Sequence, residues 1–214
     1  MTPRLLALDT CLVSDALDAL GLPGATTGIQ PLHPATRTIA GTAVTIKIGP
    51  KTTSNPEHHL ATPAIVASGP GHILVIDNQG RTDVSSWGGI LSAAARRKGI
   101  EGVVVDGAAR DVGEAHDLGF SVYGRTAVPV TARGRIVQEA WDVPIAFAGV
   151  TVAPGDLVLA DVNGVVFIPS DRAEEVLDIA ERLAARERRM IRQIDEGMSV
   201  VDVMHDTSFE EATR

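Results

Sequence analysis

Two short groups of residues have side chains or backbone suited to chemistry on a small anion. Arg110 and Asp111 are adjacent at the end of an apolar run, and a glycine pair, Gly88-Gly89, precedes them in the chain. A guanidinium donates paired hydrogen bonds to carboxylate and carbonyl oxygens and stays charged at every physiological pH. An aspartate carboxylate is a hard oxygen ligand of the kind that Mg²⁺ or Mn²⁺ prefers. The pair therefore predicts metal-assisted chemistry on an oxygen-rich substrate, with Asp111 as the metal ligand and Arg110 stabilising developing negative charge.

The glycine pair is predicted to begin a helix. Backbone N–H groups in the first turn of a helix lack partners within the helix, and the helix dipole favours an anion there. Glycine at positions 88 and 89 lets a ligand come close to the backbone. We expect Gly88, Gly89, Ile90 and Leu91, together with Arg110, to bind the carboxylate of the substrate.

Other side chains that could take part in chemistry also have simpler structural explanations. Glu114 lies three residues beyond Asp111, so in a helix it would share one side with Asp111 and orient water on the metal, unless it is an exposed helix carboxylate. His58 and His59 are adjacent and point apart, and without a His-Glu-x-x-His spacing we expect them to shape the pocket rather than bind metal. Lys47 could form a Schiff base with an oxo acid, but nothing else in the sequence supports that route.

A predicted strand–helix–strand unit positions the two groups. Residues 73–76 and 102–105 are apolar and predict buried strands, and residues 90–95 have an apolar helical pattern that ends at Lys98-Gly99. Short connections of this kind are typical of parallel strands with a right-handed crossover. The loop at 106–111 then follows the carboxyl end of a strand, which is where ligands bind in open α/β sheets.

The rest of the chain mixes helices with short strands. Thr10 is predicted to cap a helix that ends at Gly21, residues 22–38 form a loop, and residues 41–48 alternate as a strand. We further expect a short helix at 58–67 and strands at 121–123, 135–138, 145–147, 157–160 and 165–168. Asn163-Gly164 is predicted to form the hairpin between the last two strands. A helix follows at about 171–196, with Asp171 and Glu174 as a capping box, and residues 197–214 form a tail. These elements predict a single α/β domain over residues 1–214 with a central mixed sheet.

Composition excludes several classes of function. The chain has 27 Asp and Glu against 19 Lys and Arg, a formal charge of −8, so binding to a nucleic-acid backbone is not expected. Its one cysteine, Cys11, is expected to pack in a helix and excludes an internal disulfide or a multi-cysteine zinc site. No stretch reaches the roughly 18 apolar residues of a membrane span, and Asp9 and Asp15 lie where a signal peptide would be apolar. We expect a cytoplasmic protein with no membrane partner.

Five strings, in this order along the chain, resemble one family. They are Val13-Ser14-Asp15-Ala16-Leu17, Trp87-Gly88-Gly89-Ile90-Leu91, the segment from Gly102 to Asp111, Pro154-Gly155-Asp156-Leu157-Val158, and Ala160-Asp161-Val162-Asn163-Gly164-Val165-Val166. The family is the RraA-like family, which contains the 4-hydroxy-4-methyl-2-oxoglutarate and 4-carboxy-4-hydroxy-2-oxoadipate aldolases. The resemblance covers residues 10 to 185.

The resemblance implies a swivelling β/β/α fold, assembled as homotrimers or homohexamers with active sites at subunit boundaries. It implies a lyase dependent on Mg²⁺ (or Mn²⁺) that cleaves a 4-hydroxy-2-oxo acid to release pyruvate, or decarboxylates oxaloacetate through the same enolate. The aldolase pattern has an acidic residue where this chain has Gly89, and this departure leaves the substrate open. The base that takes the substrate's hydroxyl proton is either metal-bound hydroxide or a carboxylate of a neighbouring subunit.

Two other functions remain open at this point. The name-giving members of the family inhibit ribonuclease E by protein contact, so a non-catalytic regulator is the first alternative, and the presence of Arg110 and Asp111 favours the enzyme over it. The second alternative is another metal-assisted reaction of a hydroxy or oxo acid, such as isomerisation.

Overall fold

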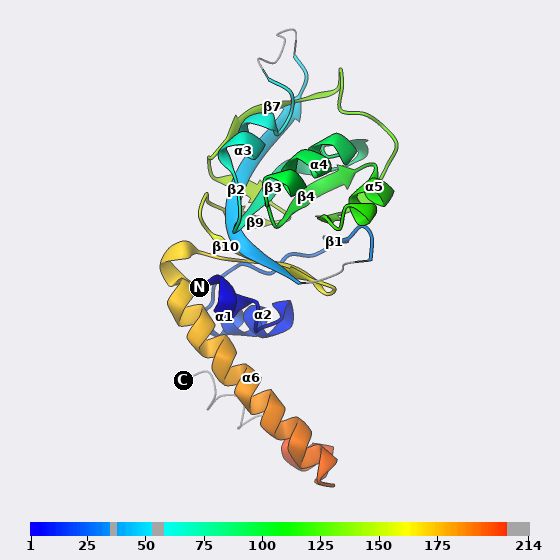
Figure 1. Ribbon diagram of the computed structural model, residues 1–214. Coiled ribbons are helices and arrows are strands. Elements are labelled where there is room, and N and C mark those ends of the chain that lie inside the picture. Colours follow the sequence, from blue (N-terminus) through cyan, green and yellow to red (C-terminus); the bar gives the residue numbers. More distant parts are fainter. Residues whose placement is uncertain (35–37, 53–57, 205–214) are drawn as a thin grey trace.

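A computed structural model describes residues 1–34, 38–52 and 58–204 of the chain. Over these residues the chain forms an α/β fold around a nine-stranded mixed sheet with the order β1-β5-β4-β3-β2-β10-β11, in which β6 adds to β4 and β7 adds to β2 (Figure 1). The strands of this sheet are β1 (Gln30–Pro31), β2 (Ile39–Pro50), β3 (His72–Ser85), β4 (Gly102–Ala109), β5 (Ser121–Gly124), β6 (Thr126–Ala127), β7 (Ile136–Trp141), β10 (Leu157–Asp161) and β11 (Gly164–Ile168). A separate hairpin pairs β8 (Ile145–Phe147) with β9 (Val150–Val152).

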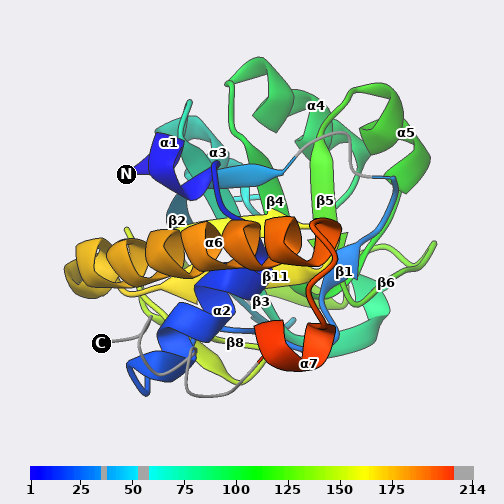
Figure 2. The same ribbon diagram turned by 90° about the horizontal axis from the view of Figure 1, so that it is seen from below.

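The helices form two main groups beside the sheet. They are α1 (Thr2–Leu5), α2 (Thr10–Ala19), α3 (Thr62–Ala67), α4 (Gly89–Arg97), α5 (Val112–Asp117), α6 (Ala173–Asp195) and α7 (Val200–Val203), with a 3₁₀ turn at Ser170–Arg172. Figures 1 and 2 show α3, α4 and α5 beside the strands β2 to β5, and α1 and α2 against the first half of α6. No helix within the described ranges is both long enough and apolar enough to cross a membrane.

The centre of the sheet is parallel, as the strand–helix–strand pattern predicted. β2 pairs with β3, β3 with β4 and β4 with β5 in parallel register. β4 is buried along its whole length, which explains why its sequence is an uninterrupted apolar run rather than an alternating one. This strand ends at Ala109, so Arg110 and Asp111 directly follow a fully buried strand at the centre of the sheet.

Three apolar clusters hold these layers together. The first joins α3, α4 and α5 to one face of the sheet, through side chains such as Ile65, Leu91 and Ala115 against Ile76 and Val105. The second covers the opposite face with the β8-β9 hairpin, and the third packs α1, α2 and α6 against β10 and β11. The site described below lies in the first layer, whereas α1, at the N-terminal end of the chain, belongs to the third cluster.

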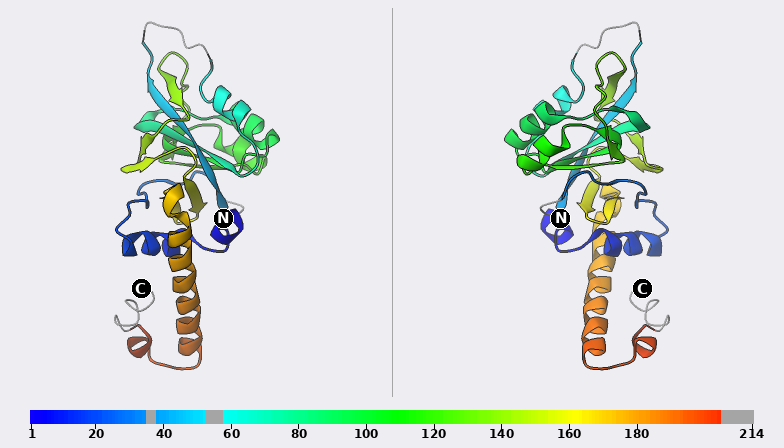
Figure 3. Two further views of the ribbon diagram at one scale, coloured as in Figure 1. Left: turned by 90° about the vertical axis from the view of Figure 1, so that its left-hand side faces the viewer. Right: turned by 90° about the vertical axis from the view of Figure 1, so that its right-hand side faces the viewer.

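Helix α6 extends beyond the third cluster. Its buried side chains all lie between Ala173 and Ala184, and the rest of the helix projects away from the body (Figures 1 and 3). Arg4 from α1 forms ion pairs with Asp178 (2.6 Å) and Glu181 (2.7 Å) on its first half. The long helix lies within the predicted range of 171–196, but Arg172 stands at its start with no side-chain cap, so the predicted capping box of Asp171 and Glu174 is wrong.

Two predicted helix starts differ from the structure for local reasons. Asp9, not Thr10, caps α2 by accepting a hydrogen bond from the Leu12 N–H (2.8 Å), and Thr10 instead donates from its backbone N–H and its hydroxyl to Asp161. Helix α3 begins at Thr62 rather than at 58, because Ala61 has a φ of 66°, a left-handed conformation that does not continue a helix. Residues 53–57, before this helix, lie outside the described residues.

Three other predictions are corrected. Cys11 lies in α2 but is exposed rather than packed. Strand β3 does not end at Asp77-Asn78 but continues to Ser85, through two register shifts against β4 at Asp77/Arg81 and Arg81/Ser85. Such irregularities interrupt the alternation of side chains, so periodicity could not follow the strand past them. The hairpin between β10 and β11 turns through Val162 and Asn163, one residue earlier than predicted.

Asp77 should make the stability of the fold depend on pH. Burial raises the pKa of this carboxyl above its ordinary value of 3.8, and the negative charge of nearby Asp106 raises it further. A hydrogen bond that Asp77 accepts from the Gln79 N–H lowers the pKa, but by less than burial raises it. When the pKa of a carboxyl is higher in the folded than in the unfolded protein, the folded protein becomes less stable as the pH rises from the pKa of the unfolded state through that of the folded state. Asp77→Asn keeps an oxygen acceptor for Gln79 but removes this titration.

We therefore expect the free energy of unfolding of Asp77→Asn, relative to that of the unmodified protein, to increase as the pH rises above about 4. Urea denaturation at several pH values measures it. A difference that stays constant with pH would show that Asp77 does not titrate in this way.

Candidate active site

The site is built where β4 ends beside the start of α4. Arg110 follows the last residue of β4, and its backbone N–H donates to the carbonyl oxygen of Trp87 (2.9 Å), which ties the two segments together. Asp111 then adopts a left-handed conformation, with φ of 55° and ψ of 35°, before α5 begins. This turn brings the Asp111 side chain back toward the glycine pair.

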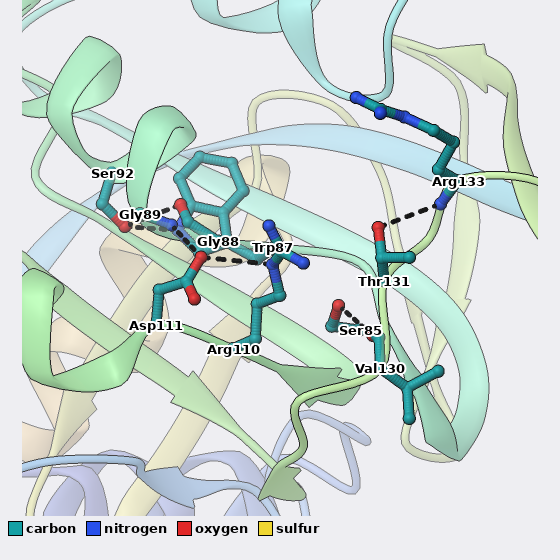
Figure 4. Close-up of polar contacts among 10 residues, drawn as sticks. All are labelled: Ser85, Trp87, Gly88, Gly89, Ser92, Arg110, Asp111, Val130, Thr131 and Arg133. Atoms are coloured by element: carbon teal, nitrogen blue, oxygen red, sulfur yellow. Dashed lines mark hydrogen bonds and ion pairs between the residues drawn. The ribbon is translucent and has the colours of Figure 1, made fainter.

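One carboxylate oxygen links the predicted site residues. Asp111 Oδ2 accepts a hydrogen bond from the Gly89 N–H (3.0 Å) and lies 3.1 Å from Arg110 Nε (Figure 4). The contact uses only the Nε–H edge of the guanidinium, and the side chains of Arg110 and Asp111 remain 39% and 32% exposed. The structure thus brings Arg110, Asp111 and the start of α4 together, as the sequence predicted.

The start of α4 is fixed by the residues around Trp87. Trp87 is buried, its ring stacks on Phe120 with centroids 6.1 Å apart, and its Nε1–H donates to Ser92 Oγ (2.9 Å). Gly88 is the N-cap in an extended conformation. The N–H of Gly89 is already used by Asp111, and those of Ile90 and Leu91 have no acceptor among the described residues. Of the N–H groups predicted to receive a substrate carboxylate, these two are therefore the ones available.

A cavity of about 300 Å³ opens beside these groups. It is lined by Gly88, Gly89, Ile90, Leu91, Arg110 and Asp111 on one side, by Ser85, Ser86 and Trp87 at the end of β3, and by His59, Leu60, Thr62, Thr131, Ala132 and Arg133 on the other side. It therefore contains two guanidinium-bearing residues, Arg110 and Arg133, in a chain whose formal charge is −8.

Sequence reasoning missed the wall formed by residues 131–133. The loop that carries them is anchored, since the N–H and the hydroxyl of Ser85 both donate to the Val130 carbonyl (3.0 and 2.6 Å), and the Ile136 N–H donates to the Ala132 carbonyl (3.1 Å). Figure 4 shows Arg133 across the open space from Arg110. No pattern in the sequence marks this loop, because its place at the site depends on the extended course of β3.

The other predicted candidates divide between the cavity and its surroundings. His59 lines the cavity, whereas His58, Lys47 and Glu114 are not part of its lining. Lys47 forms an ion pair with Glu139 (3.3 Å), so the geometry gives no support to a Schiff base there. Glu114 is exposed on α5, and its carboxylate lies against Gly89, outside the cavity wall.

Three other aspartates in the family-like segments, Asp106, Asp156 and Asp161, make hydrogen bonds within the fold and not at the cavity. Asp106 accepts hydrogen bonds from Arg125 Nε (2.5 Å) and from the Ala148 N–H (2.8 Å). Asp156 accepts from two backbone N–H groups, and Asp161 accepts from Thr10 and from the Asn163 N–H. All three are buried, so these hydrogen bonds offset the cost of burying their charge.

The donor groups at the site fit a magnesium-type ion. In the parts of the chain that the structure describes, no group of three or more His, Cys, Asp or Glu side chains is gathered around one point. Mg²⁺ does not need such a group, because it keeps several waters and binds proteins through one or two carboxylates plus substrate oxygens. Asp111 at the cavity, with Glu114 in the space beside Gly89, provides these oxygens.

Comparisons with known proteins agree with this architecture. The family model "RraA-like: Aldolase/RraA" matches residues 10–167. A protein from Halalkalibacterium halodurans, provisionally named a 4-hydroxy-4-methyl-2-oxoglutarate aldolase, is 31% identical over 194 residues, which is 91% of this chain and 88% of the relative. Protein DlpA of Legionella pneumophila is 32% identical over 208 residues, 97% of this chain, but the chain spans only 34% of that relative's length.

Solved structures give the same result. An uncharacterised protein from Pseudomonas syringae superimposes with a TM-score of 0.85 at 32% identity, covering 95% of this chain and 96% of the other. Streptomyces coelicolor RraAS2, described as an unusual member of the RNase ES inhibitor RraA protein family, gives a TM-score of 0.81 at 27% identity, covering 90% and 97%. By its sequence and by its fold, the chain belongs to the RraA-like family of aldolases and RraA proteins.

Proposed function

We propose that the protein is a divalent-metal-dependent carbon–carbon lyase that cleaves a 4-hydroxy-2-oxo acid to release pyruvate and also decarboxylates oxaloacetate. The observation that carries this proposal is the juxtaposition of the Arg110 guanidinium, the Asp111 carboxylate and the α4 start at one cavity. Both reactions pass through the same pyruvate enolate, so a site that stabilises this enolate serves both.

The residues divide the work as follows. The N–H groups of Ile90 and Leu91 receive the substrate carboxylate at the positive end of α4. Asp111 holds the Nε–H edge of Arg110, which leaves the terminal nitrogens free to donate to the keto oxygen of the substrate. These hydrogen bonds strengthen as that oxygen becomes negative. Bound Mg²⁺ or Mn²⁺ would polarise the carbonyl as a Lewis acid. Asp111 would hold that ion through its carboxylate.

The direct test is pyruvate release by the purified protein. We expect turnover of oxaloacetate, or of a 4-hydroxy-2-oxo diacid, when Mg²⁺ or Mn²⁺ is present, loss of turnover with EDTA, and recovery on adding excess metal. A coupled lactate dehydrogenase assay measures the pyruvate. Turnover that is insensitive to the chelator would contradict the metal-dependent mechanism.

Arg133 points to a substrate with a second carboxylate. It lines the cavity opposite Arg110, and its side chain has no acidic partner among the described residues. A diacid held at one end by Arg110 and α4 would place its other carboxylate toward this guanidinium, which binds carboxylates well.

We therefore expect Arg133→Ala to raise KM for a diacid about 10-fold, which corresponds to one charge-assisted hydrogen bond, with little change in kcat. The same change should leave KM for 4-hydroxy-2-oxopentanoate, which has one carboxylate, almost unaltered. Arg97→Ala, which removes an exposed arginine of α4 outside the cavity lining, is the control. Equal effects of Arg133→Ala on both substrates would show that Arg133 does not bind the second carboxylate.

A second candidate is a protein-binding regulator of an RNase E-type ribonuclease, which the likeness to the S. coelicolor inhibitor-family member favours. Surface contact would not require the Arg110–Asp111 pair, so inhibition of the ribonuclease that survives Asp111→Asn would identify this role. We further propose a homotrimer or homohexamer in the cytoplasm, whose mass light scattering would measure.

A further inference from the structure

The two reactions proposed for the cavity differ in their need for a base. To cleave a 4-hydroxy-2-oxo acid between C3 and C4, the C4 hydroxyl must lose its proton while C4 becomes a carbonyl. Oxaloacetate has no such hydroxyl, and its C4 leaves as CO₂ from a carboxylate that is already ionised. A residue that acts as this base therefore serves the first reaction and not the second.

Only two of the described residues that line the cavity have side chains able to act as general bases, Asp111 and His59. Asp111 Oδ2 already accepts a hydrogen bond from the Gly89 N–H and lies 3.1 Å from Arg110 Nε. Asp111 is also the proposed metal ligand. His59 is therefore the side chain at the cavity that remains to take a proton from the substrate.

The imidazole of His59 is held in the tautomer that a base requires. Its Nδ1 lies 3.2 Å from the carbonyl oxygen of Leu60. A carbonyl oxygen can only accept a hydrogen bond, so Nδ1 carries the proton of the neutral ring and Nε2 carries the lone pair. Nε2 has no hydrogen-bond partner among the described residues, so it is left to accept a proton.

The turn that carries His59 is anchored, although the residue itself is exposed. The His59 carbonyl oxygen accepts from the N–H (3.1 Å) and from the hydroxyl (2.6 Å) of Thr62. Leu60 is buried in the first apolar cluster, and the Ala61 N–H donates to Gln138 Oε1 in β7 (2.8 Å). The backbone of this turn is thereby fixed, while the imidazole stays accessible to a substrate that enters the cavity.

We propose that His59 Nε2 is the general base that removes the proton of the C4 hydroxyl. This inference rests on the proposed function, because it assumes that Arg110 and the start of α4 hold the 2-oxo acid end of the substrate. That end then lies against one wall of the cavity, and C4 extends toward the other wall, which His59 shares with Arg133.

The step balances without any further reactant. As Nε2 takes the hydroxyl proton, the oxygen on C4 forms a carbonyl, the C3–C4 bond breaks, and its electron pair forms the enolate of pyruvate. The enolate takes one proton from water at C3, and the imidazolium releases its proton to water. Loss of CO₂ from oxaloacetate forms the same enolate with no proton to remove.

His59→Asn separates the two reactions. The asparagine amide can take the place of Nδ1 and donate to the Leu60 carbonyl, but it cannot act as a base. With Mg²⁺ and saturating 4-hydroxy-4-methyl-2-oxoglutarate, we expect kcat for pyruvate release to fall about 10²-fold or more. The kcat for oxaloacetate should stay nearly the same. Equal losses in both reactions, or no loss in either, would overturn the proposal.

Two measurements without substrate examine the imidazole itself. Electron paramagnetic resonance of free Mn²⁺ should give the same dissociation constant for His59→Asn as for the unmodified protein, whereas weaker binding would make His59 a metal ligand and overturn its role as the base. Long-range ¹H–¹⁵N NMR at mildly alkaline pH should find the proton of the His59 ring on Nδ1. A proton on Nε2 would also overturn the proposal.

Matched controls separate this inference from the proposed function. His116→Asn changes an exposed histidine of α5 outside the cavity lining and should leave both rates and Mn²⁺ binding unchanged. If the unmodified protein does not cleave the hydroxy acid, the proposed cleavage fails and the role of His59 fails with it. If both reactions occur and His59→Asn does not separate them, only the role of His59 fails. Thermal unfolding of each variant checks that the fold is retained.

Discussion

Asp111→Asn should reduce metal-dependent pyruvate release by about 10³-fold in kcat/KM, because a Lewis acid contributes several kcal/mol to stabilising the charge that develops in the transition state. An amide oxygen is a neutral and weaker ligand than a carboxylate for Mg²⁺. Asparagine is also suited to the left-handed backbone at this position, where φ is 55°. Its side-chain oxygen can still accept from the Gly89 N–H, so the loss should reflect chemistry rather than unfolding.

The measurement is a Mg²⁺ titration of kcat/KM, accompanied by a thermal unfolding curve. Asp117→Asn, on the exposed side of the same short helix, is the matched control and should keep full activity. Asp111→Asn with activity close to that of the unmodified protein would refute the assignment of Asp111 as the metal ligand.

Arg110→Lys should lower kcat by about 10²-fold while changing KM much less, as expected for a donor whose hydrogen bond strengthens in the transition state. Lysine keeps the positive charge but lacks the planar arrangement of donors that lets arginine bond to Asp111 on one edge and to the keto oxygen on another.

Initial-rate kinetics with oxaloacetate would separate kcat from KM for this variant. Arg97→Lys, at an exposed position on α4 outside the cavity lining, should leave both unchanged. A rise in KM with unaltered kcat would assign Arg110 to ground-state binding and would require another group to stabilise the enolate.

The central part of the fold and of the site could be predicted from the sequence because local signals agreed with one another there. The apolar runs of β3 and β4, the glycine pair and the cationic end of α4 all indicated parallel strands with the site at their carboxyl ends. Because Arg110 and Asp111 follow the apolar run of β4 in the sequence, they were correctly predicted to lie at the carboxyl end of that strand. Fully buried parallel strands have the clearest sequence pattern, and β4 is buried throughout.

What could not be predicted depends on contacts between distant segments. The second half of β3 continues past two register shifts, and its end at Ser85 anchors the loop that brings Arg133 to the cavity. Asp9 rather than Thr10 caps α2 because Asp161, far along the chain, accepts both donors of Thr10. The fit of Glu114 against Gly89 is likewise a matter of side-chain direction, which helical spacing indicated only as a shared side.

The position of α1, α2 and α6 has a consequence for how this unit can be built into larger proteins. Helices α1 and α2 pack with the first half of α6 against β10 and β11, and the described chain ends in α7 beside the far end of α6 (Figures 1 and 3). The cavity is lined instead by residues of α3 and α4 and by the loop with Arg133. Polypeptide fused before α1 would therefore begin at the β10–β11 end of the sheet, away from the residues that line the cavity. The same arrangement makes the unit a practical cassette for tethering to other enzymes.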